Sequence, residues 1–193
     1  MKKVLVFGLL AIAAVAGVAI ASDTTSTTPT GWFMAGMAPD DYVTGLDKNV
    51  KHSGTSSAFI RSKENPKDFS TLMQSISPAN YGGKRLKFSA WVKTDAVSEW
   101  TGLWMRIDGG KETLEFDNMQ DRPIKGTTDW KQYEVILDVP MTSTGIFYGV
   151  LTSGTGTVWI DDAKLEVVPQ TVSTTSLKEP SRPTEPSNLG FEN

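Results

Sequence analysis

Apolar and polar residues alternate with a period of two in short runs between residues 31 and 168. Successive side chains of a β-strand point to opposite faces, so this alternation predicts strands with one buried face. Turn sequences such as Tyr81-Gly82-Gly83 separate the runs. The predicted strands span residues 57–61, 72–76, 85–93, 103–108, 113–119, 131–139, 145–152 and 157–167.

These runs indicate an all-β domain, because no stretch keeps a helical i, i+3, i+4, i+7 apolar pattern for three turns. Short strands separated by turns are typical of a two-sheet antiparallel β-sandwich, and a jelly roll is the variety that they favour. The alternation also assigns faces to the side chains. In the run 103–108, Leu103 faces the core and Trp104 faces outward, and in the run 85–93 Trp91 faces outward.

The first 21 residues have the features of a secretory signal peptide. Lys2 and Lys3 precede an uncharged apolar run that extends to Ile20, and small residues at Ala19 and Ala21 mark a cleavage site before Ser22. We therefore expect a secreted protein, extracellular or periplasmic. The alternative is an uncleaved membrane anchor, because the apolar run approaches the length of a membrane span; the leader would then be the chain's one link to a membrane.

The rest of the chain has the length of one domain with tails. Residues 22–30 and 169–187 are rich in Ser, Thr and Pro and poor in apolar residues, which is typical of solvated, extended segments. The predicted parts are a signal peptide (1–21), a disordered Ser/Thr leader (22–30), the β-sandwich (31–168), a Pro/Ser/Thr-rich linker (169–187) and a C-terminal strand (188–193).

Composition argues against several classes of function. The chain has no cysteine and a single histidine, His52, which excludes disulfides, thiol chemistry and a usual zinc site. The net charge is −3 without a basic cluster, so we expect no nucleic-acid partner. Neither a serine-nucleophile motif nor a second histidine accompanies His52, and we expect no enzymatic activity.

Three blocks of the sequence resemble a known family. They are HSGTSSA at residues 52–58, KFSAWVK at residues 87–93 and VWIDDAKL at residues 158–165. These blocks resemble the carbohydrate-binding modules of xylanases and cellulases, which are galactose-binding-like jelly rolls. The resemblance covers residues 31–168 and implies that fold together with a non-catalytic binding role.

The first strand of that family has moved in this chain. The family begins with a strand of the type Asn-x-Gly-Phe-Glu, and here this pattern occurs at residues 188–193. In one interpretation the chain is a circular permutant whose tail pairs with residues 157–167 of the same molecule. In a second, the tail completes the sandwich of a neighbouring molecule and the protein self-associates. In a third, the tail is the start of a truncated second module.

The resemblance also implies a structural calcium ion. The matching ligands are Asp47, Asp161 or Asp162, and Glu192, with backbone carbonyls supplying further oxygens. An alternative is that the paired aspartates only cap a strand.

Sugar-binding sites need aromatic rings and polar side chains, and outward positions supply both. The predicted ligand-binding residues are Trp91, Trp104, Arg106, Gln74 and Tyr148, joined by Trp100, Asp117, Asn118 and Arg122 from the loop region. Pairing of Arg122 with Asp117 or Asp121 that only holds the loop is the alternative for that segment. We expect the other tryptophans, Trp32, Trp130 and Trp159, to be buried.

The sequence therefore favours a secreted, non-catalytic module that binds polysaccharide or a cell-surface glycan. Two alternatives stay open: a self-associating extracellular subunit that donates its C-terminal strand, and an accessory or sensor domain for a ligand that is not a sugar.

Overall fold

The protein is described by a computed structural model over residues 24–25 and 27–176. The predicted signal peptide and C-terminal strand lie outside the described residues. Among the described residues, no helix combines the length and the apolar character of a membrane span.

The described chain is all-β, as the alternation predicted, with one short 3-10 helix, η1, at Pro39–Asp41. The strands are β1 (Thr24–Thr25), β2 (Phe33–Gly36), β3 (Tyr42–Asp47), β4 (Ser57–Ser62), β5 (Ser70–Ile76), β6 (Lys84–Gly109), β7 (Glu112–Asp117), β8 (Ile124–Val139), β9 (Gly145–Ser153) and β10 (Thr157–Val168).

Strand β6 belongs to both layers of the sandwich. Its first half pairs with β10 and β8, and its second half pairs with β9 and β7. Between the halves Ala96 has a φ of 51°, a left-handed conformation that bends the strand. The runs predicted at 85–93 and 103–108 are therefore one continuous strand that crosses from one sheet to the other.

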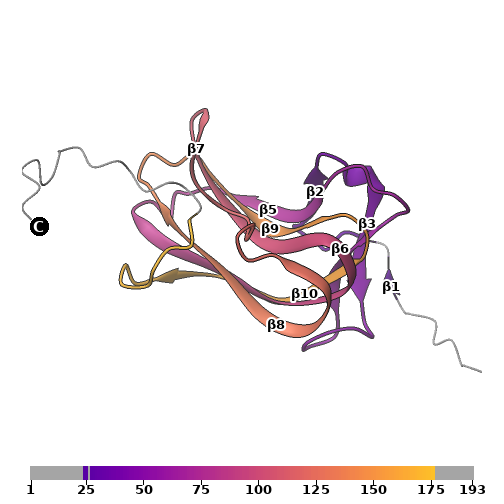
Figure 1. The fold of residues 1–193 in the computed structure, drawn as a ribbon. Coiled ribbons are helices and arrows are strands. Elements are labelled where there is room, and N and C mark those ends of the chain that lie inside the picture. The colour runs from indigo at the N-terminus through magenta and orange to yellow at the C-terminus, as the bar shows by residue number, and fades with distance from the viewer. Residues whose placement is uncertain (1–23, 26, 177–193) are drawn as a thin grey trace, which may run out of the picture.

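We call the two layers the lower sheet and the upper sheet, after their places in Figure 1. The lower sheet has the order β1-β3-β4-β10-β6-β8, and the upper sheet has the order β2-β5-β9-β6-β7. All their strand pairs are antiparallel. This arrangement confirms the predicted β-sandwich.

The core fills the space between the sheets. Alternate residues of each strand face inward, among them Leu86 and Phe88 in the lower sheet and Leu103 and Met105 in the upper sheet, all fully buried. Because the period is two, the residues between them must face outward, and the outer face of each sheet is a possible binding surface.

The sequence analysis did not predict strands β2 and β3. Strand β2 is only four residues long, and β3 is interrupted by Gly45, so neither shows an extended alternation. The segments 22–30 and 169–187, expected to be extended and solvated, both include residues that are hydrogen-bonded to the sandwich. Thr24–Thr25, in the predicted leader, pairs with Leu46 and Asp47 of β3.

The start of the predicted linker is bound to the lower sheet. Thr175 N donates to the carbonyl of Ile136 at 2.8 Å, and Ile136 N donates to Thr175 Oγ1. Arg85 donates to the carbonyls of Gln170 and Val172. Gln170 and Val172 therefore contact Arg85 of β6, and Thr175 lies at the outer edge of β8.

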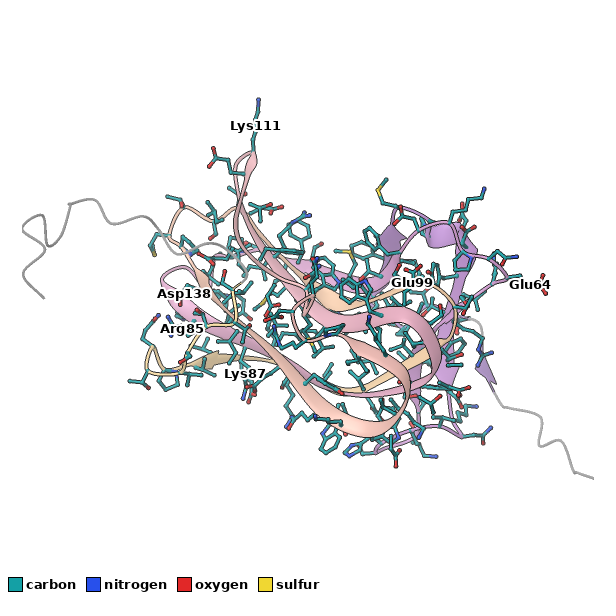
Figure 2. All side chains as sticks on the ribbon, viewed as in Figure 1. Glu64, Arg85, Lys87, Glu99, Lys111 and Asp138 are labelled. Carbon is teal, nitrogen blue, oxygen red and sulfur yellow. The ribbon has the colours of Figure 1, made fainter. Side chains whose placement is uncertain are left out.

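Arg85 also forms a paired ion contact with Asp138. Its Nε and Nη2 each donate to a separate carboxylate oxygen at 2.8 Å, and the two side chains lie together in Figure 2. The hydrogen bonds from Arg85 hold the pKa of Asp138 below its ordinary value of 3.8.

This lowered pKa predicts a contribution to acid stability. A carboxylate with a depressed folded-state pKa stabilises the fold above its ordinary pKa and loses that effect as the pH falls toward the folded value. The chain with Asp138→Asn should therefore show a shallower fall in Tm between roughly pH 5 and 3 than the unaltered chain. Thermal unfolding followed by circular dichroism checks this; parallel curves for the two proteins would contradict it.

Candidate functional site

The outer face of the upper sheet carries an apolar cluster, which we call the outer aromatic face. Buried Met73, Trp104 and Leu151 form its floor. Packed against them are the partly exposed side chains of Ala35, Trp100, Phe116 and Phe147. The register Phe33↔Met73 places Phe33 on the same face, and its side chain is 42% exposed.

Trp104 is the centre of this floor. It faces outward as predicted, yet it is only 7% exposed because its neighbours cover the ring. Its indole Nε1 donates to Thr71 Oγ1 on β5 at 2.6 Å, which fixes the ring across two strands. A ligand on this face would contact the surrounding rings more than Trp104 itself.

A polar pair lies beside the aromatic rings. The guanidinium carbon of Arg106 lies 4.8 Å from the centroid of Phe147, a cation–π geometry. Arg106 Nη2 donates to Asp108 Oδ2 at 2.9 Å. Arg106 Nε lies 2.9 Å from Asp108 Oδ1, but it is not aligned for a hydrogen bond, and this buried N–H has no acceptor among the described residues. The pair offers both donors and carboxylate acceptors next to the rings.

Gln74 and Tyr148 do not belong to this face, so their predicted outward orientation was wrong. Tyr148 lies in the main core, 5.0 Å from Phe88 and 6.2 Å from Trp32 between ring centroids. Its hydroxyl donates to Gln74 Oε1 at 2.5 Å. Burial raises the pKa of Tyr148, so the pair is a neutral, internally satisfied one.

Asp117, Asn118 and Arg122 hold their own loop, which was the alternative interpretation of that segment. Asp117 is fully buried and receives Arg122 Nη1 at 3.2 Å, Arg122 Nη2 at 2.5 Å and the N–H of Met119 at 2.7 Å. Arg122 also donates to Asp121 at 2.8 Å. Asn118 accepts the N–H of Gln120. These contacts fix the turn between β7 and β8.

Trp91 lies on the other side of the molecule, on the outer face of the lower sheet. The His52 ring stacks on it with the centroids 3.8 Å apart, and Trp130 meets the same histidine edge-on at 5.9 Å. The two tryptophans that the alternation placed together as outward residues, Trp91 and Trp104, are therefore on opposite surfaces and cannot share one ligand.

Of the three tryptophans expected to be buried, the structure buries one. Trp159 is buried, as predicted, and donates to Asp47 Oδ2 at 3.0 Å. Trp32 and Trp130 are only partly buried, so that part of the prediction was wrong. Trp32 packs against the main core from its edge, and Trp130 lies beside His52 on the outer face of the lower sheet.

The aspartates predicted to bind calcium accept hydrogen bonds from the chain. Asp47 receives the N–H groups of Asn49 and Val50 besides Trp159. Burial raises the pKa of Asp47, but these donors outweigh it and leave the pKa below its ordinary value.

The loop that contains His52 uses the other two carboxylates. The N–H groups of His52 and Ser53 donate to Asp161 Oδ2, and their side chains contact Asp162. A calcium ion would have to displace these donors, and among the described residues no cluster of acidic and histidine side chains is arranged to hold a metal. Glu192, the remaining predicted ligand, lies outside the described residues.

The sequence analysis missed three aromatic residues of the outer aromatic face, Phe33, Phe116 and Phe147. Phe147 lies between the core residues Ile146 and Tyr148 and could have been assigned outward by the period of two. Phe116 shares its face of β7 with Leu114, and its neighbours are Glu115 and Asp117, so the same pattern would have placed it inward. Phe33 lies in the short strand β2, which has no such pattern.

Comparisons with known proteins agree with the fold. No protein-family model matches the chain. It is similar to the CBM22-1 xylan-binding domain of Xyn10C from Paenibacillus barcinonensis, with a TM-score of 0.54 and 16% identity over 77% of this chain and 93% of that one. It is also similar to a Stig cyclase from Fischerella sp. TAU, with a TM-score of 0.54 and 15% identity over 79% and 92% of the two chains. These likenesses show the fold alone.

A third comparison is with a sequence relative. The chain is 40% identical over 166 residues to an uncharacterized HTH-type transcriptional regulator, YbfP, of Bacillus subtilis. The match covers 84% of this chain but 56% of that protein, so the chain spans about half the length of this relative.

Proposed function

We propose that the protein is a non-catalytic module that binds polysaccharide on its outer aromatic face. The partly exposed rings of Phe33, Trp100 and Phe147 would stack on the CH faces of successive sugars. Arg106 and Asp108 would donate to and accept from sugar hydroxyls at the same place. Polysaccharides suit such a surface because it is a row of rings on a sheet and not a closed pocket.

The observation that supports this proposal most strongly is the apolar character of an outward sheet face. Outward positions of an antiparallel sheet are usually polar, and a continuous apolar patch on a soluble domain marks an interaction site. The fold-level likeness to xylan-binding domains adds support. Fluorescence titration with soluble xylans, glucans and mannans, together with pull-down on insoluble polysaccharides, tests it; absence of binding to every glycan would contradict it.

We further propose that the chain acts outside the cytoplasm after cleavage behind Ala21. Thr24–Thr25 is already part of the lower sheet, so this cleavage keeps β1 intact. The mass of the protein exported from its native host should then correspond to a chain that starts at Ser22. Intact-mass spectrometry checks this, and an exported or cell-bound protein that retains residues 1–21 would contradict it.

A second candidate function is that of a sensor domain, which the YbfP relative favours. The described residues contain β-strands and no α-helix, so what they share with that regulator is not the helix-turn-helix, which is built from two helices. A sensor would bind a small soluble ligand. Binding of a monosaccharide or another small molecule that persists in Phe33→Ala would favour the sensor, whereas binding of polymers alone would favour the module.

A further inference from the structure

A crevice opens between the two sheets at one side of the sandwich, and we call it the side crevice. Its volume is about 150 Å³, and apolar side chains of Trp32, Ala58, Leu72 and Ile160 line it together with residues 161–163. Leu72 and Ile160 belong to the main core. The side crevice is therefore a place where the core reaches the surface of the described protein.

The second half of β10 has an open edge beside this crevice. Strand β4 pairs with β10 as far as Ile160, and beyond it residues 164–168 pair with β6 on the other side. Within the described residues, no strand pairs with β10 on the β4 side after Ile160. The backbone N–H and C=O groups on this side of β10 can therefore pair with a further strand, as those of any sheet edge can.

The described residues cover the core incompletely along this edge. Val167 is paired with Leu86, a fully buried residue, so both side chains point toward the inside of the sandwich. Yet Val167 is 52% exposed, and Leu165 on the same side is only partly buried. An inward apolar side chain that meets solvent indicates a missing neighbour.

The facing sheet has a matching gap. Strand β2 pairs with β5 only over Ser70–Met73, and residues 74–76 pair with β9 alone. Ile76, which packs against the main core, is partly exposed at this position. The opening therefore extends from the side crevice along β10 on one side and β5 on the other.

We propose that residues 188–193 of the same chain form the missing strand on the open edge of β10. In this segment Leu189 and Phe191 alternate with Asn188, Gly190 and Glu192. A strand with this pattern turns its two apolar side chains to one face and its polar residues to the other. Leu189 and Phe191 then cover the exposed core, and a cavity of this size accepts a ring as large as benzene.

Residues 177–187 are long enough to connect Thr175 with a strand on the open edge of β10. Thr175 lies along the outer edge of β8, and β6 and β10 follow β8 across the lower sheet. Neighbouring strands are about 4.8 Å apart, so the open edge is roughly 15–20 Å from Thr175. Residues 177–187 can span up to roughly 35 Å when extended. A connection within one molecule is therefore feasible without strain.

Hydrogen–deuterium exchange of the full chain tests the proposal, with Phe191→Ser compared to Asn188→Ser. Phe191→Ser should accelerate amide exchange of residues 162–168 and lower Tm by roughly 5 °C or more, because a packed ring is lost. Asn188→Ser changes a polar position of the same segment and should leave both unchanged. Equal exchange and equal Tm in Phe191→Ser and the unaltered chain would overturn the proposal.

A mass measurement then separates this proposal from strand exchange between molecules. Light scattering should find a monomer at all concentrations, with residues 162–168 protected from exchange even in dilute solution. Oligomers that disappear in Phe191→Ser would show that the tail enters a neighbour and would overturn the intramolecular arrangement. Neither readout depends on glycan binding, so the test is independent of the proposed function.

Discussion

Replacing Asp117 by alanine is expected to lower the free energy of unfolding by about 2–4 kcal/mol, since it removes a buried charged hydrogen-bond acceptor. The Asp117 carboxylate is fully buried and accepts hydrogen bonds from Nη1 and Nη2 of Arg122 and from the N–H of Met119. Without it the Met119 N–H loses its acceptor, and Met119 itself packs in the core. Urea unfolding monitored by tryptophan fluorescence measures the change.

Asp121→Ala is the matched control. Asp121 contacts the same arginine at 2.8 Å, but its side chain is 58% exposed. Exposed ion pairs contribute about 0–1 kcal/mol, so this variant should unfold nearly as the unaltered chain does. If the two variants had equal stability, the loop between β7 and β8 would not depend on the buried carboxylate.

Replacing Phe33 or Phe147 by alanine is expected to weaken polysaccharide binding by roughly tenfold or more for each ring, equivalent to about 1.4 kcal/mol or more. Phe33 is 42% exposed and Phe147 is partly exposed beside Arg106, so both can contact a sugar. Phe33→Ala removes little buried area and should leave the fold stable. Isothermal titration with the polysaccharide that binds most tightly gives the affinities.

Trp130→Ala is the control for this prediction, because Trp130 lies beside His52 on the outer face of the lower sheet. Its binding should equal that of the unaltered chain. Loss of binding in Trp130→Ala together with full binding in Phe33→Ala and Phe147→Ala would move the site to the opposite surface. If none of these three variants lost polysaccharide binding, the binding site would lie on neither outer face.

The alternation of side chains made most of the sandwich predictable. In the second half of β6 it correctly separated the inward side chains of Leu103, Met105 and Ile107 from the outward side chains of Trp104 and Arg106. It failed for Tyr148, which lies in the main core, and for its hydrogen-bond partner Gln74, which is partly buried on the same inward side. A polar pair in a core has no sequence pattern of its own, because the hydrogen bond that makes its burial possible joins residues far apart in the chain.

The candidate site was predictable only in part. Trp104 and Arg106 were identified from their outward positions and Trp100 from the loop region, and the structure places all three near Phe116 and Phe147. Trp91 was grouped with them because it also faces outward. Local alternation distinguishes inside from outside, but it does not tell which sheet a face belongs to.

The sequence by itself determined the class of fold, the inward side of most strands, and the absence of cysteine thiols. Those properties follow from the period of two and from residue types, which are local. The tertiary structure alone decided that β6 bends at Ala96 between the sheets, so that Trp91 and Trp104 lie on opposite surfaces. It also decided that Asp161 receives the N–H groups of His52 and Ser53 and that the described residues leave Val167 half exposed. These features arise from strand order and loop closure between distant residues, which no local pattern encodes.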